Sequence, residues 1–200
     1  EWLVGPSRIL LCQLDLAERA GTDPVATEIL RRLCAYVASA PPPTWRDATY
    51  TGSDAGRAYL APHAIRDSAR IAEDGVIITD GAVEPGQVDW LLGHADRGGT
   101  LFLVNPTVEA LQAFGLSAEA QPVWHAPPPR EEWPLLAGVS PSDLYWRQER
   151  TVPVLTDLPA GSRATTPAVV GEIPHGKGRL VIWTVNAAQY DDLLTAYENN

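Results

Sequence analysis

The stretch Gly75-Val-Ile-Ile-Thr-Asp80-Gly81 decides the fold class of the chain. It is a continuous apolar run that ends in Asp-Gly, which is typical of a parallel strand buried on both faces. A helix should follow, because Pro85 suits a first helical position and an apolar stripe over residues 88–95 precedes a glycine pair. A second strand, Thr100-Leu-Phe-Leu-Val104, leads into a helix over 107–114. This βαβα order predicts an α/β domain with right-handed crossovers and a doubly wound, mostly parallel sheet.

The flanking sequence continues the pattern less regularly. Residues 48–52 are a strand candidate, and residues 54–70 form a helical or mixed stretch. Residues 121–134 are rich in Pro and Trp and are predicted to be irregular. We also expect a short helix opening at 140–143, a turn around 175–178, and strands at 152–155, 168–173 and 179–185.

The beginning and the end of the chain carry similar sequences. Gly5-Pro-Ser-Arg8-Ile-Leu-Leu-Cys12-Gln-Leu-Asp15 aligns with Gly176-Lys-Gly-Arg179-Leu-Val-Ile-Trp183-Thr-Val-Asn186 in glycine, arginine, apolar run and final Asp or Asn. Each copy is typical of a turn, a buried strand and a following helix, the element that closes an α/β domain. Since one copy opens the chain, we expect a piece of a larger protein.

The first copy is followed by a well-marked helix. Asp23 can cap it, Pro24 suits its first position, and it should end near Ser39, before the stiff connector Pro41-Pro42-Pro43. We therefore predict two parts. Residues 1–43 are the terminal strand and helix of a preceding α/β domain plus a Pro-rich linker, and residues 44–200 are one complete α/β domain. The apolar side chains of Ile9, Leu11 and Leu14 should pack against another part of the protein, because a lone strand and helix bury too little surface.

Composition excludes several function classes. The net charge is −10, with 15 basic against 25 acidic residues, and no basic stripe is present that could follow a phosphate backbone. No apolar run approaches the roughly 20 residues of a membrane span. We expect neither a nucleic acid nor a membrane as partner. The sequence leaves the cellular location open and favours the cytoplasm.

Metal and cofactor sites are not expected. The four histidines, at 63, 94, 125 and 175, show no metal-ligand spacing and pair with no cysteine. Cys12 and Cys34 are too few for a disulfide framework, and both are predicted to be reduced core residues.

Residues 75–107 resemble the core of class I glutamine amidotransferase-like domains, which have a flavodoxin-like fold. In that family the second strand ends in a tight elbow that carries a cysteine nucleophile, and a histidine and a glutamate follow a late strand. Here the elbow falls on Asn105-Pro106, and the late strand ends in Trp183-Thr-Val-Asn186. The resemblance therefore implies the fold without amidotransfer. Asn105 is instead expected to cap the next helix, and the crevice beside Asp80 to be a vestige.

A closer resemblance covers most of the chain. The phrases beginning at Arg8 and Gly176, and Pro134-Leu-Leu-Ala-Gly-Val-Ser-Pro-Ser-Asp-Leu-Tyr-Trp146, are similar to C-terminal amidotransferase-like modules of bacterial glycoside hydrolases in the β-galactosidase and β-glucuronidase superfamily. Their catalytic carboxylates lie upstream on a (β/α)8 barrel that this chain does not contain. The resemblance implies a carbohydrate-active parent enzyme whose other domains, or further copies of the chain, are the partners.

Four residues are candidates for ligand binding. Asp80 ends a parallel strand, where ligands of open α/β sheets bind, although Asp-Gly is also a common turn. Trp124, Trp133 and Trp146 lie in or beside the Pro-rich segment, where exposed rings could stack on a sugar or instead cover the core. Trp90 and Trp183 are predicted to be core residues. No catalytic residue is assigned.

Three functions remain open. The first is a non-catalytic structural and assembly module of a glycoside hydrolase. The second is a carbohydrate-binding module that uses its tryptophans. The third is a stand-alone hydrolase with Cys12 as nucleophile, which the apolar surroundings of Cys12 disfavour.

Overall fold

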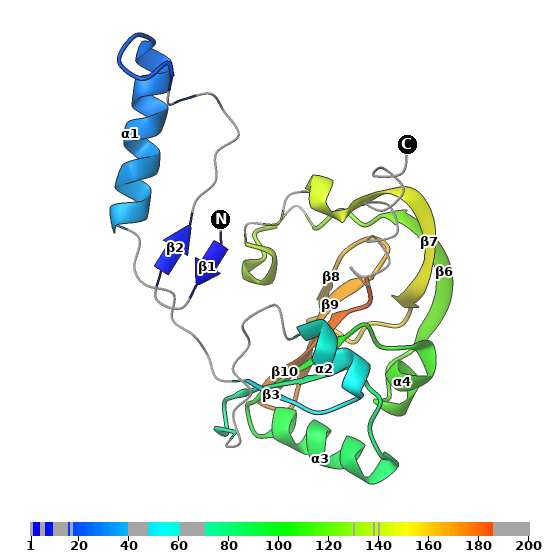
Figure 1. Ribbon diagram of the computed structural model, residues 1–200. Coiled ribbons are helices and arrows are strands. Elements are labelled where there is room, and N and C mark those ends of the chain that lie inside the picture. Colours follow the sequence, from blue (N-terminus) through cyan, green and yellow to red (C-terminus); the bar gives the residue numbers. More distant parts are fainter. Residues whose placement is uncertain are drawn as a thin grey trace. The chain divides into compact units, whose positions relative to one another are not determined.

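The computed structural model describes residues 2–4, 7–9, 16, 18–39, 48–60, 71–129, 131–137, 139 and 141–185 (Figure 1). The chain divides into two compact units, Glu1–Trp45 and Arg46–Asn200. Each unit is described by itself.

The described part of the first unit contains a short ribbon and one helix. Strand β1 (Trp2–Val4) pairs antiparallel with β2 (Ser7–Ile9), and helix α1 spans Pro24–Ser39. The predicted start and end of this helix are confirmed: Asp23 Oδ1 accepts from the amides of Val25 at 2.8 Å and Ala26 at 3.3 Å. The strand predicted up to Asp15 is described only as far as Ile9. The predicted packing of Ile9, Leu11 and Leu14 lies outside the described side chains, as does Cys12.

The prediction that Cys34 is a core residue is wrong, because its side chain is exposed. Among the described residues of the first unit, Leu16 and Ala26 are buried, whereas Val25, Tyr36 and Val37 on α1 are exposed. A single helix and a short ribbon offer too little surface to cover every apolar position of that helix.

The second unit is built on a six-stranded sheet in the order β3-β4-β5-β10-β9-β8. Neighbours from β3 to β10 pair in parallel, while β10, β9 and β8 pair antiparallel. The predicted α/β class with a mostly parallel sheet is therefore confirmed. The strands are β3 (Ala48–Tyr50), β4 (Val76–Thr79), β5 (Thr100–Val104), β8 (Arg163–Ala164), β9 (Val170–His175) and β10 (Gly178–Trp183).

Helices lie on both faces of this sheet. Alternation along the strands puts Leu101 and Leu180 on one face, where they share a core with residues of α3 (Pro85–Asp96) and α4 (Val108–Ala113). Tyr50 and Ile78 lie on the other face, in a smaller cluster with residues of α2 (Asp54–Leu60). Among the described strands the order runs forward from β3 to β5 and then backward from β10 through β9 to β8. A flavodoxin-like strand order stays a prediction.

Helix α3 begins at Pro85, as predicted, and the Glu84 amide donates to Gln87 Oε1 at 3.1 Å. Its stripe of Val88, Leu91 and Ala95 is buried. Trp90, however, is 50% exposed, so its predicted place in the core is wrong. At about 100° per residue, Trp90 lies on the side of the helix opposite to that stripe.

The first part of the segment predicted to be irregular, residues 121–125, is strand. Strand β6 (Ala118–His125) pairs antiparallel with β7 (Tyr145–Leu155), with an irregularity between Val123 and His125. Strand β6 was not predicted because it contains Pro122, and proline usually interrupts a strand. A two-stranded ribbon, however, has open edges, where a proline without an amide proton is tolerated. Two short 3-10 helices, η2 (Pro134–Leu136) and η3 (Pro141–Leu144), connect the strands, the second near the predicted short helix.

The ribbon encloses a second hydrophobic cluster, which we call the ribbon core. Trp183, which was predicted to be a core residue, is only partly buried and packs against the margin of this cluster. The predicted turn at 175–178 is confirmed, with His175 opposite Gly178 and a φ of 55° at Gly176. None of the described helices is long and apolar enough to cross a membrane. The ribbon core contains Val123, Ala126, Trp133, Leu136, Leu144, Trp146, Val152, Val154, Val169, Val170 and Val185.

Candidate functional site

The carboxyl ends of β3 and β4 bring Asp80 against the loop that precedes α2. Ser53 Oγ donates to Asp80 Oδ2, and the Ser53 amide lies 3.3 Å from both carboxylate oxygens. The Ala82 amide donates to Oδ1 at 3.0 Å. Asp80 therefore ties its own turn to the neighbouring loop and does not cap α3, which begins at Pro85.

The space around this carboxylate is filled by protein atoms. Ser53 Oγ accepts from the Gly56 amide at 3.0 Å, and Tyr50 Oη donates to the Ser53 carbonyl at 3.0 Å. Gly52 and Gly56 lie so close to Tyr50 Oη and the Asp80 carboxylate that a methyl group at either position would overlap with both. The glycines thus permit close packing here and do not open a ligand pocket.

The two ionisable groups of this cluster are poised away from proton transfer at neutral pH. Burial opposes the ionisation of Asp80, but the hydrogen bonds from Ser53 and Ala82 outweigh it and hold its pKa below the ordinary value. Burial, followed by the negative charge of Asp80, raises the pKa of Tyr50 to about 12. Asp80 stays ionised and Tyr50 protonated, so neither suits general acid–base catalysis.

Asn105 occupies the turn between β5 and α4. Its φ is 51°, and among the described residues no other residue except glycine has a positive φ. Its amide donates to the Trp183 carbonyl at 2.8 Å, while its side-chain Oδ1 is buried with no hydrogen-bond partner within the described part of the chain. The predicted helix cap at Asn105 is wrong: Thr107 caps α4, with its Oγ1 accepting from the Ala110 amide at 3.1 Å. The cap thus lies two residues after Asn105 and three residues after the end of β5 at Val104.

The three candidate tryptophans have different surroundings. Trp133 and Trp146 are 5% and 7% exposed and belong to the ribbon core, so their ring faces are not available for stacking on a sugar. Trp124 is 50% exposed and makes an edge contact with Tyr145, whose side chain is 53% exposed, at 5.7 Å between ring centroids. Trp124 and Tyr145 thus form a solvent-facing aromatic pair on β6 and β7.

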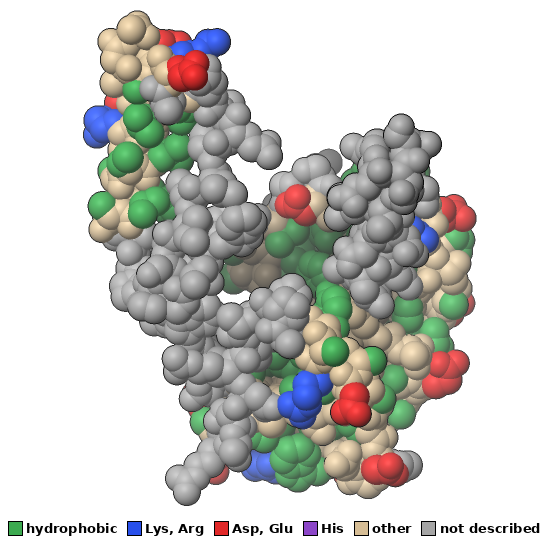
Figure 2. Space-filling view, viewed as in Figure 1, with side chains coloured by type: hydrophobic (Ala, Val, Ile, Leu, Met, Phe, Trp, Pro, Cys, Tyr) green, Lys and Arg blue, Asp and Glu red, His purple; other side chains and the backbone are tan. Residues whose placement is uncertain are grey.

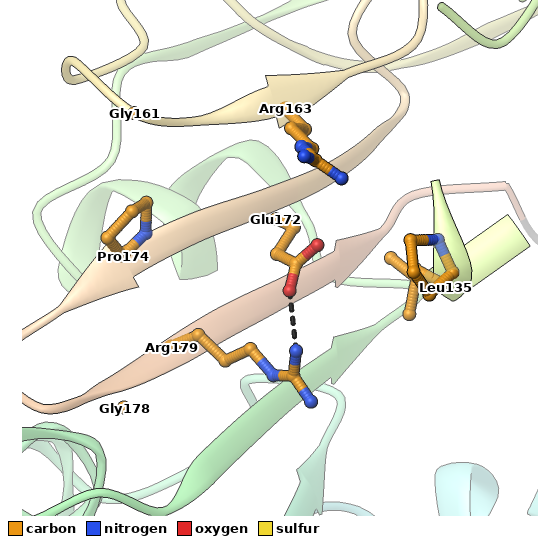
Figure 3. Close-up of a pocket in the computed structure, with 8 residues that line it drawn as sticks. Leu135, Gly161, Arg163, Glu172, Pro174, Gly178 and Arg179 are labelled. Atoms are coloured by element: carbon orange, nitrogen blue, oxygen red, sulfur yellow. Dashed lines mark hydrogen bonds and ion pairs between the residues drawn. The ribbon is translucent and has the colours of Figure 1, made fainter. Parts of the chain in front are cut away.

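A groove that the sequence analysis missed lies over β8, β9 and β10. Its volume is about 730 Å³, and its polar residues are Arg163, Glu172 and Arg179 (Figure 3). Arg179 Nη1 donates to Glu172 Oε1 at 2.6 Å, and the indole of Trp133 donates to Glu172 Oε2 at 2.7 Å. The signal available in the sequence was the hairpin turn at 175–178, since pairing across it puts residues 172 and 179 on one face.

Glu172 is held as a carboxylate. Burial disfavours its charge, but the Trp133 indole and the Arg179 guanidinium together hold its pKa below the ordinary value. The groove therefore carries two positive guanidinium groups and one negative carboxylate at neutral pH.

Charges elsewhere form no comparable site. Figure 2 shows acidic and basic side chains scattered over the visible part of the second unit, and its coloured residues form no continuous basic stripe. No group of three or more His, Cys, Asp or Glu side chains among the described residues could hold a metal ion.

Comparisons of the chain with protein families, with curated proteins and with solved structures found no match. The candidate sites are therefore interpreted from their own geometry.

Proposed function

We propose that residues 46–200 form a non-catalytic amidotransferase-like module of a carbohydrate-active glycoside hydrolase, acting through contacts with the other domains of its parent or with further copies. The observation that carries this proposal is the turn after β5. Asn105 has a φ of 51°, a left-handed backbone at a strand-to-helix turn, which is the conformation of a nucleophile elbow. The side chain at this position is a neutral amide, which is neither a nucleophile nor a base.

The surroundings of the elbow support the proposal that this turn has no catalytic activity. A non-glycine residue with positive φ is uncommon and costs about 1 kcal/mol or more, so the surrounding fold must impose it. Asp80, after the neighbouring strand, is engaged by Ser53 and Ala82. A module that descends from an enzyme but has lost its catalytic activity would keep the backbone of the elbow and carry an unreactive side chain there.

Two of the described histidines, His94 and His175, do not supply a base at this turn. His94 Nε2 lies 3.0 Å from the carbonyl of Gly75, which precedes β4, so His94 belongs to the opposite edge of the sheet from Asn105. His175 ends β9 and lies 3.4 Å from Asp96 at that same opposite edge. Neither of these two histidines can therefore activate a nucleophile or a water molecule at Asn105.

The purified chain tests this proposal directly. We expect hydrolysis of neither aryl glycosides nor glutamine above the buffer rate, and association with the parent's remaining domains or self-association in light scattering. Turnover that Asn105→Ala abolishes, while Trp90→Ala retains it, would contradict the non-catalytic assignment. A chain that is strictly monomeric and does not bind the other domains of its parent would contradict the assembly role.

A second candidate function is carbohydrate binding through the aromatic pair. The exposed rings of Trp124 and Tyr145 are the observation that favours it. Trp90 offers a matched control, because it is also 50% exposed but lies on α3. Affinity electrophoresis in plant polysaccharides should show retardation that Trp124→Ala removes and Trp90→Ala preserves. Equal mobility of all three proteins with and without polysaccharide would exclude this function.

A further inference from the structure

Two hollows of opposite charge adjoin on the surface of the second unit. The first is the groove over β8, β9 and β10, whose charged residues are Arg163, Glu172 and Arg179. The second has a volume of about 360 Å³, and its acidic residues are Glu131 and Glu132. Arg163 lines both hollows, so a basic and an acidic surface meet at this residue. We call these five residues the charge-paired face.

The segment 131–135, which contributes to both hollows, is held in place by contacts with the sheet. Trp133 in its middle is buried, and its indole donates to Glu172 Oε2 at 2.7 Å. Arg163 Nη1 lies 3.4 Å from the carbonyl of Glu132. A surface that is fixed before its partner arrives loses little conformational entropy on binding.

The two arginines can be reached only from their solvent sides, because Glu172 lies between them (Figure 3). Arg163 is exposed, and the side chain of Arg179 is about half exposed. Arg179 Nη1 donates to Glu172 Oε1 at 2.6 Å and its Nε to Thr100 Oγ1 at 3.3 Å, while its other terminal nitrogen points away from Glu172 (Figure 3). The face therefore presents oriented guanidinium groups to a second molecule.

The two glutamates are the complement of these arginines. Glu131 and Glu132 are both exposed, and neither forms an ion pair with a basic side chain in the part of the chain that the structure describes. Exposed apolar surface adjoins the charges, since Leu135 and Pro174 line the same groove as Arg163. Apolar contacts together with charges of both signs are typical of a protein interface.

This arrangement fits a second copy of the chain. In a twofold dimer, a residue that contacts a second residue of the partner is itself matched by the reverse contact, so the surface must contain its own complement. The charge-paired face meets this condition, because its basic and acidic hollows share Arg163. The chain has a net charge of −10, which opposes self-association in general. The described groups of this face are two positive and three negative, so repulsion between two copies is small here.

We propose that the charge-paired face is a twofold interface between two copies of this chain. Arg163 of each copy pairs with Glu131 and Glu132 of the other, Arg179 adds positive charge beside it, and Leu135 lies within the contact. The inference rests on the assembly part of the proposed function, whose surface and partner it specifies. It does not rest on the inactive turn at Asn105.

Sedimentation equilibrium of the whole chain tests the interface. We expect a dimer of the 21.6 kDa chain, which Arg163→Glu weakens by at least about tenfold. The double substitution Glu131→Arg and Glu132→Arg should weaken it similarly, although it makes the chain less negative. Arg97→Glu is the matched control, because Arg97 is an exposed arginine at the end of α3, outside the groove, and the change of charge is the same. It should change the dissociation constant by about twofold at most.

Mixing the two weakened variants gives the sharpest test. A homodimer of either variant places like charges at both Arg163 contacts, whereas a heterodimer of the two places opposite charges at both. We therefore expect the heterodimer to be at least about tenfold tighter than either homodimer. An electrostatic effect within one chain cannot produce this rescue, because each chain in the mixture keeps its own substitutions.

Thermal denaturation should show that all variants are folded. A dimer that Arg163→Glu and Arg97→Glu weaken equally would overturn this inference and leave the assembly role in place. A monomeric chain that still binds the other domains of its parent would overturn the second copy as the partner. A mixture of the two variants that forms no heterodimer would overturn the twofold pairing.

Discussion

The two edges of the parallel sheet use their charged groups in opposite ways. At the carboxyl edge, Asp80 is engaged by Ser53 and Ala82, and two glycines let protein atoms close the space around it. At the amino ends of β5 and β10, Glu172 and Arg179 pair inside an open groove. The rule that ligands bind beyond the carboxyl ends of parallel strands directs attention to the first region. A carboxylate at the end of a parallel strand therefore indicates a ligand site only when its hydrogen-bond partners are known and leave it accessible.

The largest effect should come from overfilling the closed edge. Gly56→Ala forces a methyl group onto Tyr50 Oη and the Asp80 carboxylate, so we expect a loss of about 2 kcal/mol in the free energy of unfolding, despite the better helix propensity of alanine. Gly86→Ala is the control, because no heavy atom lies within 4 Å of the added methyl group, and it should stabilise the protein by about 0.5 kcal/mol. Urea denaturation measures both. Equal effects of the two substitutions would show that the carboxyl edge is not closed.

The next effect concerns the charge of Asp80. Asp80→Asn removes the charge-assisted hydrogen bonds with Ser53 and Ala82, and we expect a loss of about 1.5 kcal/mol at pH 7, with allowance for partial exposure. Asp89→Asn, on the exposed side of α3, should change stability little. If both variants lost the same stability, Asp80 would be an ordinary solvated charge.

The same variant gives a pH signature. Because the pKa of Asp80 is lowered in the folded protein, its stabilisation is fully present above the unfolded value of about 4 and is lost as pH falls through the folded value. Urea denaturation at several pH values should therefore show a shallower loss of stability below about pH 4 in Asp80→Asn than in the unchanged protein. Parallel curves would contradict the lowered pKa.

The backbone of the elbow predicts a difference between two variants. Asn105→Ala and Asn105→Gly both remove the buried amide oxygen, but only glycine adopts a φ of 51° without a steric penalty. We expect the glycine variant to be more stable than the alanine variant by about 1 kcal/mol in urea denaturation. Equal stabilities would show that the fold does not impose the left-handed turn, and the elbow argument for the proposed function would fail.

The smallest effect should be found in the open groove. Glu172→Gln keeps an oxygen for the Trp133 indole and weakens only the pair with Arg179, whose side chain is about half exposed. We expect a loss of about 0.5 kcal/mol in thermal or urea denaturation. A cost larger than that of Asp80→Asn would reverse the comparison between the two edges.

Sequence patterns predicted the parts of the fold whose signals are local. The runs at 76–78 and 101–104 are apolar throughout, and Asp23-Pro24 and Pro85 mark helix starts that the structure confirms. Trp90 was wrongly predicted to be buried because the prediction relied on its large aromatic side chain and not on its position on the helix. The strand β6 was missed because Pro122 reads as a break.

The groove could not be predicted from local patterns. Arg163, Glu172 and Arg179 belong to three strands, and only the register between those strands brings them together. Asp80 was identified at the correct edge, but its partner Ser53 lies 27 residues earlier in the sequence. Trp133 and Trp146 became core residues through the ribbon, whose first strand was not foreseen.

The position of β10 has a consequence for how the chain acquires its structure during synthesis. This strand comes late in the sequence but lies between β5 and β9 in the sheet. Until residues 178–183 leave the ribosome, β5 has an unpaired edge, and Leu101 and Leu103 lack the neighbours Leu180 and Ile182 that cover them. The parallel sheet therefore closes only after β10 has been synthesised, and until then the growing chain exposes the apolar edge of β5 to chaperones and to aggregation.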